Sequence, residues 1–314
     1  MRRLRFRPWQ IAVAIFTGGF LALNAATHTI RIYHWFTLLA IPAALWSGER
    51  GRKFFLDWIP LLAFWISYDR LRWVQPLLLD RVAVRWPYRI EQWVFGWSSR
   101  GGVPPHAARA WLATAGGTPA GSWVLWMAQV VYLSHIFAVP VLLLIWWVAG
   151  LSSEQYRGRF ARHLYAFTAL NAIGLLGYVV LPVAPPWWVT LYGTAQPSPE
   201  LVRGASLAAA MDGRIVQEMI KTAADWFAAI PSLHAAYPTL LLLLGRKDYG
   251  WSVLATIALY DLAMWIACVA LNQHYIIDLI AGAMAAAAAC WIGDRLYFRR
   301  GNATVHSQQN WIVS

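Results

Sequence analysis

Charged residues are scarce in this chain of 314 residues. They make up 13% of it, whereas hydrophobic residues make up 59%, and soluble domains carry about 25% charged residues. The mean hydropathy is +0.46. This shortage of charge excludes an ordinary soluble domain and indicates that a lipid bilayer is the main solvent, which apolar helices of about 20 residues can span. The 21 tryptophans agree with this setting, because Trp collects at membrane interfaces.

Cysteine is nearly absent as well. Cys268 and Cys290 both lie in apolar runs, so the sequence offers neither a disulfide framework nor a metal-ligand spacing. We expect two small packing residues, no metal and no cofactor. The basic and apolar N-terminus MRRLRFRPW is not followed by a clear cleavage site of small residues, which predicts an uncleaved first helix rather than a signal peptide.

The net charge of +12 is not gathered into one basic patch. Lys and Arg fall in short clusters between apolar segments, a pattern typical of cytoplasmic loops that face anionic lipids. No nucleic-acid recognition motif accompanies them. The sequence therefore predicts membrane lipids as partners, and no nucleic acid.

The apolar segments predict an all-α fold, a polytopic transmembrane helical bundle with about eight spans. These lie near residues 9–26, 31–47, 54–73, 122–149, 163–182, 231–245, 251–270 and 274–293. The distribution of basic clusters places both termini in the cytoplasm by the positive-inside rule. No internal repeat or linker divides the chain, so residues 1–314 are treated as a single membrane domain.

Two long segments, residues 74–121 and 183–230, are predicted to be extracytoplasmic and interfacial. The first mixes Trp with Arg, which is typical of amphipathic structure lying on a bilayer. The second opens with PVAPPWW and a Pro-rich turn region before short amphipathic helices. We interpret its Trp187 and Trp188 as interface anchors rather than as a wall around a lipid headgroup.

The motif QHYIID begins the last predicted span. Its His274 and Asp278 are four residues apart and share one face of a helix. A carboxylate in this position fixes the tautomer of the imidazole and stabilises its charged form, as a nucleophilic or general-base histidine requires. A buried aspartate in a membrane helix also needs such a partner.

The motif PSLH begins the sixth predicted span, and the span count puts it on the same side as QHYIID. Pro231 suits the first turn of a helix, whose free amides form an anion site together with the hydroxyl of Ser232. His234 lies beside this site and can donate a proton to a leaving oxygen. The two motifs together indicate phosphoryl transfer through a phosphohistidine, without an obligatory metal.

PSLH and HYIID, forty residues apart, resemble the type 2 phosphatidic acid phosphatase superfamily of integral membrane lipid phosphatases. Within it they look closest to the branch that contains inositol phosphorylceramide synthase. The resemblance covers about residues 160–293, which would hold the catalytic core motifs, and it implies a six-helix phosphatase-type core. It also implies His274 as the nucleophile, Asp278 as its orienter and His234 as the acid for the leaving group.

Basic residues that many members of this family carry are missing. Ala267 and Cys268 stand where the family has Ser and Arg, and the Lys-x6-Arg-Pro motif is absent. The phosphate then needs positive charge from elsewhere, and the candidates are Arg70, Arg72, Arg203, Arg214 and Lys221. Tyr237 and Tyr275 flank the motif histidines and either line the site or belong to an interfacial belt. For His135, a structural hydrogen bond is favoured over a role in the site.

We expect an enzyme that acts on a lipid phosphate ester in a bacterial plasma membrane, with its active site facing outside. Water, or an alcohol such as a polyol or a glycan hydroxyl, would resolve the phosphoenzyme, so lipid phosphatase and headgroup phosphotransferase both stay open. The alternative is a non-catalytic lipid transporter or scaffold on the same fold. Transport predicts charged residues near the middle of the spans, whereas these motifs sit at one face.

Overall fold

The computed structural model describes residues 7–27, 48–115 and 117–309, with side chains placed as far as residue 299. The described residues form helices joined by turns, and their only strand-like pairings are two isolated β-bridges. The span predicted at residues 31–47 lies outside the described residues. The chain forms two compact units, Met1–Trp65 and Ile66–Ser314.

The first unit contains α1 (Pro8–Ala26) and the beginning of α4 (Gly48–Val74). Arg7, just before α1, donates a hydrogen bond to Glu49 in the first turn of α4. Further along both helices, the rings of Trp9 and Phe55 lie 6.3 Å apart. These contacts pair the two helices at the start of each.

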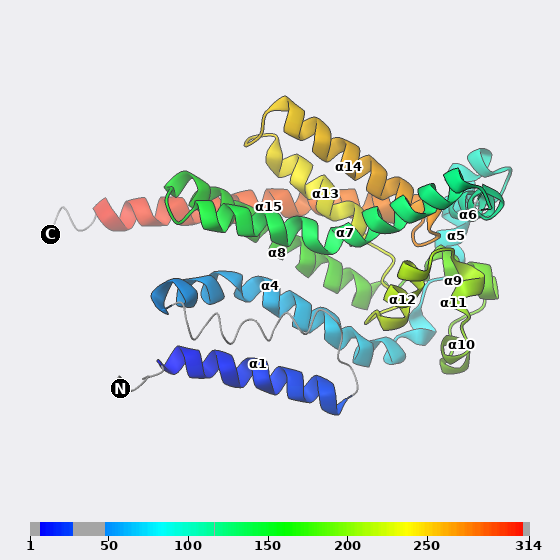
Figure 1. Cartoon of the computed structure of the whole chain (residues 1–314), viewed down its shortest axis with the longest axis horizontal. Coiled ribbons are helices and arrows are strands. Elements are labelled where there is room, and N and C mark those ends of the chain that lie inside the picture. Colours follow the sequence, from blue (N-terminus) through cyan, green and yellow to red (C-terminus); the bar gives the residue numbers. More distant parts are fainter. Residues whose placement is uncertain (1–6, 28–47, 116, 310–314) are drawn as a thin grey trace. The chain divides into compact units, whose positions relative to one another are not determined.

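The second unit is built on long helices of strongly apolar sequence (Figure 1). They are α7 (Pro119–Ala149), α8 (Glu154–Val180), α13 (Leu233–Gly245), α14 (Trp251–Ala270) and α15 (Ile276–Gln309). Among the described helices, α1, α7, α8, α14 and α15 are long and apolar enough to cross a membrane, and α13 is a shorter apolar helix. The all-α membrane bundle is thereby confirmed, while the count of eight spans and the side of the termini stay predictions.

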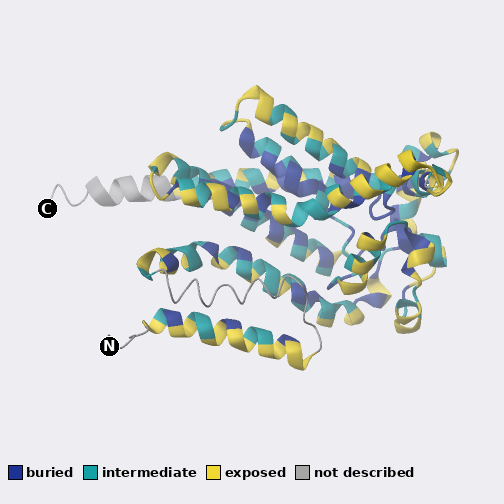
Figure 2. Ribbon diagram, in the orientation of Figure 1, coloured by how far each residue is buried: buried dark blue, intermediate teal, exposed yellow. Residues whose placement is uncertain are grey.

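The surface of the long helices is apolar where it faces outward. Figure 2 shows exposed residues along α7 and α14 and buried residues concentrated in α13. Large side chains on these exposed faces include Phe137, Ile145, Leu259 and Leu262, all more than half exposed. In water such a surface would be unstable, whereas lipid tails solvate it.

Helix α8 begins earlier than the predicted span at residue 163. It starts at Glu154, so the basic cluster of residues 157–162 belongs to the helix. The reason is pairing: the Arg162 guanidinium is buried and contacts Asp294 at 2.5 Å and Asp248 at 2.9 Å. These carboxylates offset the cost of burying its charge, and they tie α8 to α15.

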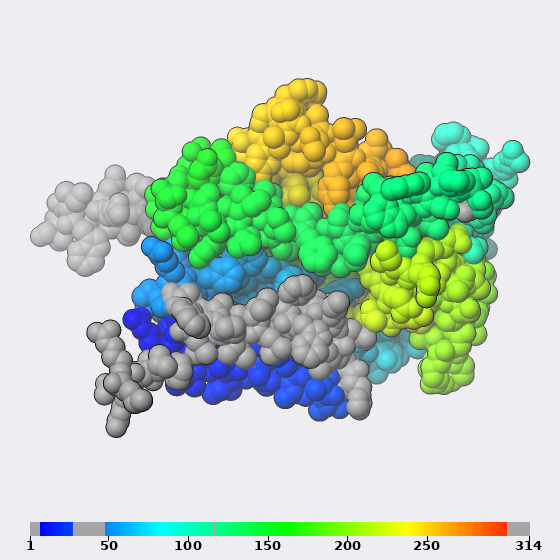
Figure 3. Space-filling view, viewed as in Figure 1, coloured from blue at the N-terminus to red at the C-terminus, as the bar shows by residue number. Residues whose placement is uncertain are grey.

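Short helices gather at the end of the unit where α13 and α15 begin (Figures 1 and 3). We call them the cover; they come from residues 75–115 and 183–230, and the main ones are α5 (Arg85–Phe95), α6 (Pro104–Ala115), α9 (Pro186–Tyr192), α10 (Pro199–Arg203), α11 (Leu207–Ala210) and α12 (Arg214–Thr222). Val183 forms bridges with Ala83 and with Ala228. Arg109 of α6 also donates to the carbonyl of Ala209 at 3.0 Å. The two predicted interfacial segments therefore form one packed structure.

The prediction for Trp187 and Trp188 is wrong. Their exposed fractions are 1% and 0%, so neither ring can anchor in an interface. Trp187 meets Trp226 edge to face with ring centres 5.5 Å apart. Trp188 packs against Phe227, and its indole nitrogen donates to the carbonyl of Ala195 at 3.0 Å. Because the cover supplies partners for both the rings and the indole, these residues form its core.

Candidate active site

Helix α13 starts at Leu233, two residues later than a helix with Pro231 as its first residue. Ser232 is the N-cap residue, and its hydroxyl oxygen accepts the amide of Ala235 at 3.5 Å. Pro231 therefore precedes the helix and does not belong to its first turn. The reason is that a serine is a stronger N-cap residue than the alternatives nearby. His234 follows as the second residue of the helix.

A tight loop of residues 271–275 presents His274. Asn272 adopts a left-handed backbone with φ of 60°, which Asn tolerates better than most residues. The amides of Gln273 and His274 both donate to the carbonyl of Cys268, at 3.0 and 3.3 Å. Asn272 is fully buried, and its side-chain amide donates to Thr190 and to the carbonyl of Ala210 in the cover. The loop is thus held by α14 on one side and by the cover on the other.

The two motif histidines meet. Nε2 of His274 lies 3.2 Å from Nδ1 of His234. On the other side of the His274 ring, Nδ1 lies 3.4 Å from Oδ2 of Asp278. With Nδ1 facing a carboxylate, the Nδ1–H tautomer is favoured, and the lone pair of Nε2 is directed at His234. The structure therefore places the His274 imidazole between the imidazole of His234 and the carboxylate of Asp278.

Close backbone packing between α13 and α15 fixes this alignment. The amide of Ser232 donates to the backbone carbonyl of Asp278 at 3.1 Å. One turn further along α15, a Cβ on Gly282 would lie 2.3 Å from the carbonyl oxygen of Ser232. Only glycine leaves room for this approach, which brings the start of α13 against α15.

Two side chains of α7 surround His234. The ring of Tyr132 stacks on it, with ring centres 4.0 Å apart, and the ring of His135 lies 3.9 Å away. Nδ1 of His135 is hydrogen-bonded to the carbonyl of Tyr132 at 2.6 Å. The predicted structural hydrogen bond of His135 exists, and the same residue also contacts the site.

The two predicted tyrosines lie at different depths. The Tyr275 side chain is fully buried beside Asp278 at the start of α15. Tyr237 lies one turn further into the bundle, where its hydroxyl donates to Asn171 of α8 at 2.7 Å. Tyr275 is therefore next to the histidine pair, whereas Tyr237 holds α13 to α8.

Four of the five predicted basic residues pair with acidic residues close to them in sequence. Arg70 and Arg72 pair with Asp69 near the end of α4. Arg203 pairs with Glu200 on its own helix, and Lys221 pairs with Glu218 on its own helix. Arg214 is exposed at the start of α12. All five therefore stay candidates for an approaching anion rather than established members of the site.

Glu91 is a residue near the site that sequence reasoning missed. It belongs to α5 in the cover, and its side chain is fully buried. Its carboxylate accepts the backbone amides of Ile276 and Ile277, at 2.9 and 3.1 Å. No local sequence pattern predicts this contact, because Ile276 lies 185 residues from Glu91 in the sequence.

The described residues contain no group of three or more His, Cys, Asp or Glu side chains placed to hold a metal ion.

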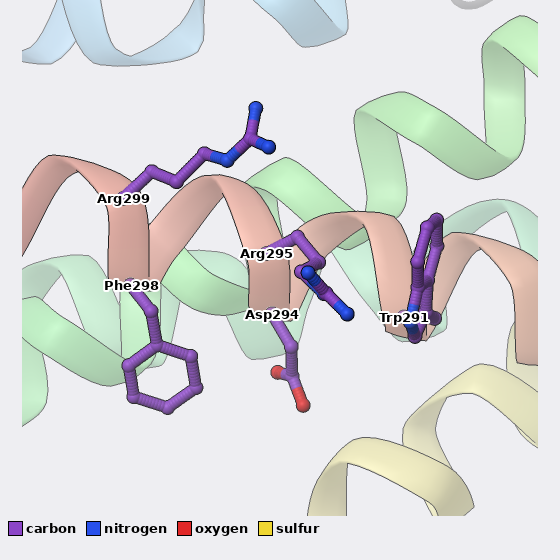
Figure 4. Close-up of a pocket in the computed structure, with 5 residues that line it drawn as sticks. All are labelled: Trp291, Asp294, Arg295, Phe298 and Arg299. Carbon is purple, nitrogen blue, oxygen red and sulfur yellow. The ribbon is translucent and has the colours of Figure 1, made fainter.

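A shallow pocket of about 410 Å³ lies elsewhere, along α15, and is lined by Trp291, Asp294, Arg295, Phe298 and Arg299 (Figure 4). At about 1.5 Å of rise per residue, its lining begins roughly 25 Å along the helix from His274. It is therefore separate from the histidine pair.

Comparisons with known proteins agree with this geometry. Residues 107–292 match the model of the PAP2 superfamily. The chain is 26% identical to the phosphoinositol dihydroceramide synthase of Bacteroides thetaiotaomicron, over 96% of this chain and 95% of that protein. It is 27% identical to the catalytic subunit of inositol phosphorylceramide synthase of Schizosaccharomyces pombe, over 40% of this chain and 30% of that protein.

A third relative is the inositol phosphorylceramide synthase of Candida albicans, at 29% identity over 38% of this chain and 26% of that protein. No solved structure gives a significant match. The matched family region contains both histidine motifs and the helices that carry them. The chain belongs to the PAP2 superfamily and is an integral membrane enzyme of lipid phosphoryl transfer.

Proposed function

We propose that this enzyme transfers a phosphoinositol headgroup from a lipid phosphodiester to the hydroxyl of a ceramide-type lipid, through a phosphohistidine on His274. The observation that carries the proposal is the 3.2 Å contact between Nε2 of His274 and Nδ1 of His234, with Asp278 behind the His274 ring. The choice of headgroup and acceptor is supported by the Bacteroides relative, which aligns over nearly the full length of both chains.

In the first step, the lone pair of Nε2 of His274 attacks phosphorus. The phosphorus–nitrogen bond forms as the bond between phosphorus and the leaving lipid alcohol breaks. His234, protonated on the nitrogen that faces the site, transfers its proton to the leaving oxygen. Asp278 stabilises the positive charge that the His274 ring gains. The phosphoryl group has to enter between the two rings, so their direct contact opens when substrate binds.

In the second step, the hydroxyl of the acceptor lipid gives its proton to the now neutral His234. The oxygen attacks phosphorus, the phosphorus–nitrogen bond breaks, and its electron pair returns to Nε2 of His274. Both histidines are then in their starting states. No net proton, electron or metal is consumed, so the cycle closes with the side chains that the chain supplies.

The shortage of basic residues supports a phosphodiester substrate. A phosphodiester carries one negative charge, whereas a phosphomonoester carries about 1.5 to 2 at neutral pH. Ala267 and Cys268 replace two polar residues that phosphatases of the family use, as the sequence resemblance implies. A site with less positive charge stabilises a monoanion relative to a dianion, which favours headgroup transfer over monoester hydrolysis.

Burial of the nucleophile supports transfer to an alcohol rather than to water. His274 is 5% exposed, and the cover packs against the loop that carries it. A covered site limits hydrolysis of a reactive intermediate. The positive-inside distribution of Lys and Arg supports an extracytoplasmic location of this site.

The test uses purified protein in mixed vesicles with phosphatidylinositol as donor and dihydroceramide as acceptor. The wild type should form phosphoinositol dihydroceramide and release diacylglycerol in equal amounts. His274→Ala should abolish both products, and His234→Ala should lower turnover by about 10²-fold or more, since it removes an acid–base group.

His163→Asn is the matched control, because His163 is a buried histidine of α8 whose ring contacts the carbonyl of Arg159 and Tyr249. It should keep wild-type turnover. Release of inositol phosphate without the ceramide product would assign the enzyme to hydrolysis. Full turnover by His274→Ala would overturn the phosphohistidine.

A further inference from the structure

Glu91 makes an unusual connection between the cover and the catalytic loop. Its carboxylate oxygens accept two successive amides of α15, Ile276 through Oε1 and Ile277 through Oε2. Its exposed fraction is 0%. Both amides belong to the first turn of a helix, where amides lack partners in their own helix. Glu91 therefore acts as an N-terminal cap that comes from a distant part of the chain.

The neighbouring amide is held by a second carboxylate. The amide of Tyr275 donates to Oδ2 of Asp278 at 2.9 Å. Three successive amides, at residues 275 to 277, thus end on the carboxylates of Asp278 and Glu91. His274 immediately precedes them. Any rotation of this first turn would move the His274 ring and the Asp278 carboxylate together, and it would change the line between Nε2 and His234.

Burying a carboxylate here costs free energy. Within the described residues Glu91 forms no ion pair, and the titratable groups near it are Asp278 of α15 and Tyr275, which immediately precedes α15. Burial raises the pKa of Glu91 to about 7, while its two backbone hydrogen bonds lower it. The positive end of α15 is the compensating charge. An apolar side chain would fill this space at lower cost but would leave two amides unpaired.

We propose that Glu91 is a positioning residue, which holds the first turn of α15 so that His274 and Asp278 keep the geometry of attack. The inference rests on the proposed function, since it assigns the geometry to a nucleophilic His274. It also gives the cover a role in the reaction, because Glu91 of α5 fixes the orientation of the nucleophilic histidine. Glu91 itself does not contact the reacting atoms.

The experiment compares kcat and KM of the wild type, Glu91→Gln and Glu91→Ala in the vesicle assay with phosphatidylinositol and dihydroceramide. Gln keeps the size of Glu but has one acceptor oxygen, so one amide faces an NH₂ group; Ala accepts neither amide. We expect kcat to fall by about tenfold in Glu91→Gln and by about a hundredfold in Glu91→Ala, with KM within about twofold of the wild type. Glu154→Gln is the control, because Glu154 is 83% exposed on α8.

Folding is separated from positioning by counting only protein that elutes as a single species and by measuring its melting temperature. The proposal is supported if kcat per folded molecule falls in Glu91→Gln and falls further in Glu91→Ala. Wild-type kcat per folded molecule in both variants, or a change in KM alone, overturns it. If the wild type shows no transfer or hydrolysis on this panel, the proposed function fails instead, and that result is independent of Glu91.

Discussion

At the scale of single residues, the carboxylate of Asp278 contacts both the helix start and the nucleophile. Its Oδ2 accepts the amide of Tyr275 at 2.9 Å and lies 3.4 Å from Nδ1 of His274. An asparagine can keep one of these contacts but has no charge to stabilise the imidazolium that forms during attack. We expect Asp278→Asn to fold and to lose turnover by about 10²-fold or more, by analogy with the aspartate of a Ser-His-Asp triad.

The check for Asp278→Asn is kcat in the vesicle assay, with the melting temperature as the measure of folding. A variant with full turnover would show that the carboxylate serves only the helix start. If the variant lost folding and turnover together, the loss of activity would be explained by unfolding and not by the missing charge.

The pKa of Glu91 predicts two opposite pH effects. The value is about 7 in the folded protein and 4.5 for the free side chain, so the folded state binds this proton more tightly. The contribution of Glu91 to stability is therefore fully present below pH 4.5 and is lost as pH rises through 7. Turnover should change the other way, because a protonated carboxyl accepts one amide less. We expect the wild type to lose activity as pH falls below about 7.

Glu91→Gln has no proton to gain, so both effects should disappear in it. The measurements are kcat and melting temperature of the two proteins between pH 5 and 8. The stability of the wild type relative to Glu91→Gln should decrease from pH 5 to pH 8. An identical acid limb of kcat in the variant would assign that limb to another group, such as Asp225, whose pKa burial raises to about 6.

Sequence reasoning reached His234, His274 and Asp278 because each carries a local signal. A histidine and an aspartate four residues apart share a helix face, and a Ser before an apolar run marks a helix start. Glu91 carries no such signal, since its role depends on a tertiary contact. The prediction for Trp187 and Trp188 was wrong for a related reason. Local sequence does not distinguish a tryptophan buried in the cover from one at a membrane interface, because burial depends on tertiary contacts.

At the scale of helices, Gly282 controls the contact between α13 and α15. A Cβ at this position would stand 2.3 Å from the carbonyl oxygen of Ser232 and 3.2 Å from its carbonyl carbon. Backbone atoms cannot yield as a flexible side chain does, so the helices have to separate. We expect Gly282→Ala to destabilise the protein by about 1–3 kcal/mol and to lower turnover, because PSLH moves relative to His274.

Gly250→Ala provides the control for this prediction. Gly250 precedes α14 with φ of −72°, and nothing lies within 4 Å of its added Cβ. Its melting temperature and turnover should stay close to those of the wild type. Equal behaviour of the two variants would mean that the close approach of α13 to α15 is not required.

At the scale of the whole molecule, the helical class could be predicted because composition and hydropathy act along entire segments. The boundaries could not: α8 begins at Glu154, since Arg162 finds Asp248 and Asp294 as buried partners. The cover could not be predicted either, because it depends on bridges of Val183 with Ala83 and with Ala228, which lie far from Val183 in sequence. These are long-range contacts, and neither periodicity nor charge patterning encodes them.

The orientation in the membrane gives the last prediction. If the cover is extracytoplasmic and the end of the bundle at the start of α8 is cytoplasmic, single cysteines at these places should differ in access to a membrane-impermeant maleimide. Thr194 is exposed in the cover, and Glu154 is exposed at the start of α8. Replacing Cys290, which is partly exposed, by Ala removes background labelling, while Cys268 is buried. In intact cells Thr194→Cys should be labelled, whereas Glu154→Cys should need permeabilisation. The reverse pattern would place the histidine pair on the cytoplasmic face, and its lipid substrates would then have to come from the inner leaflet.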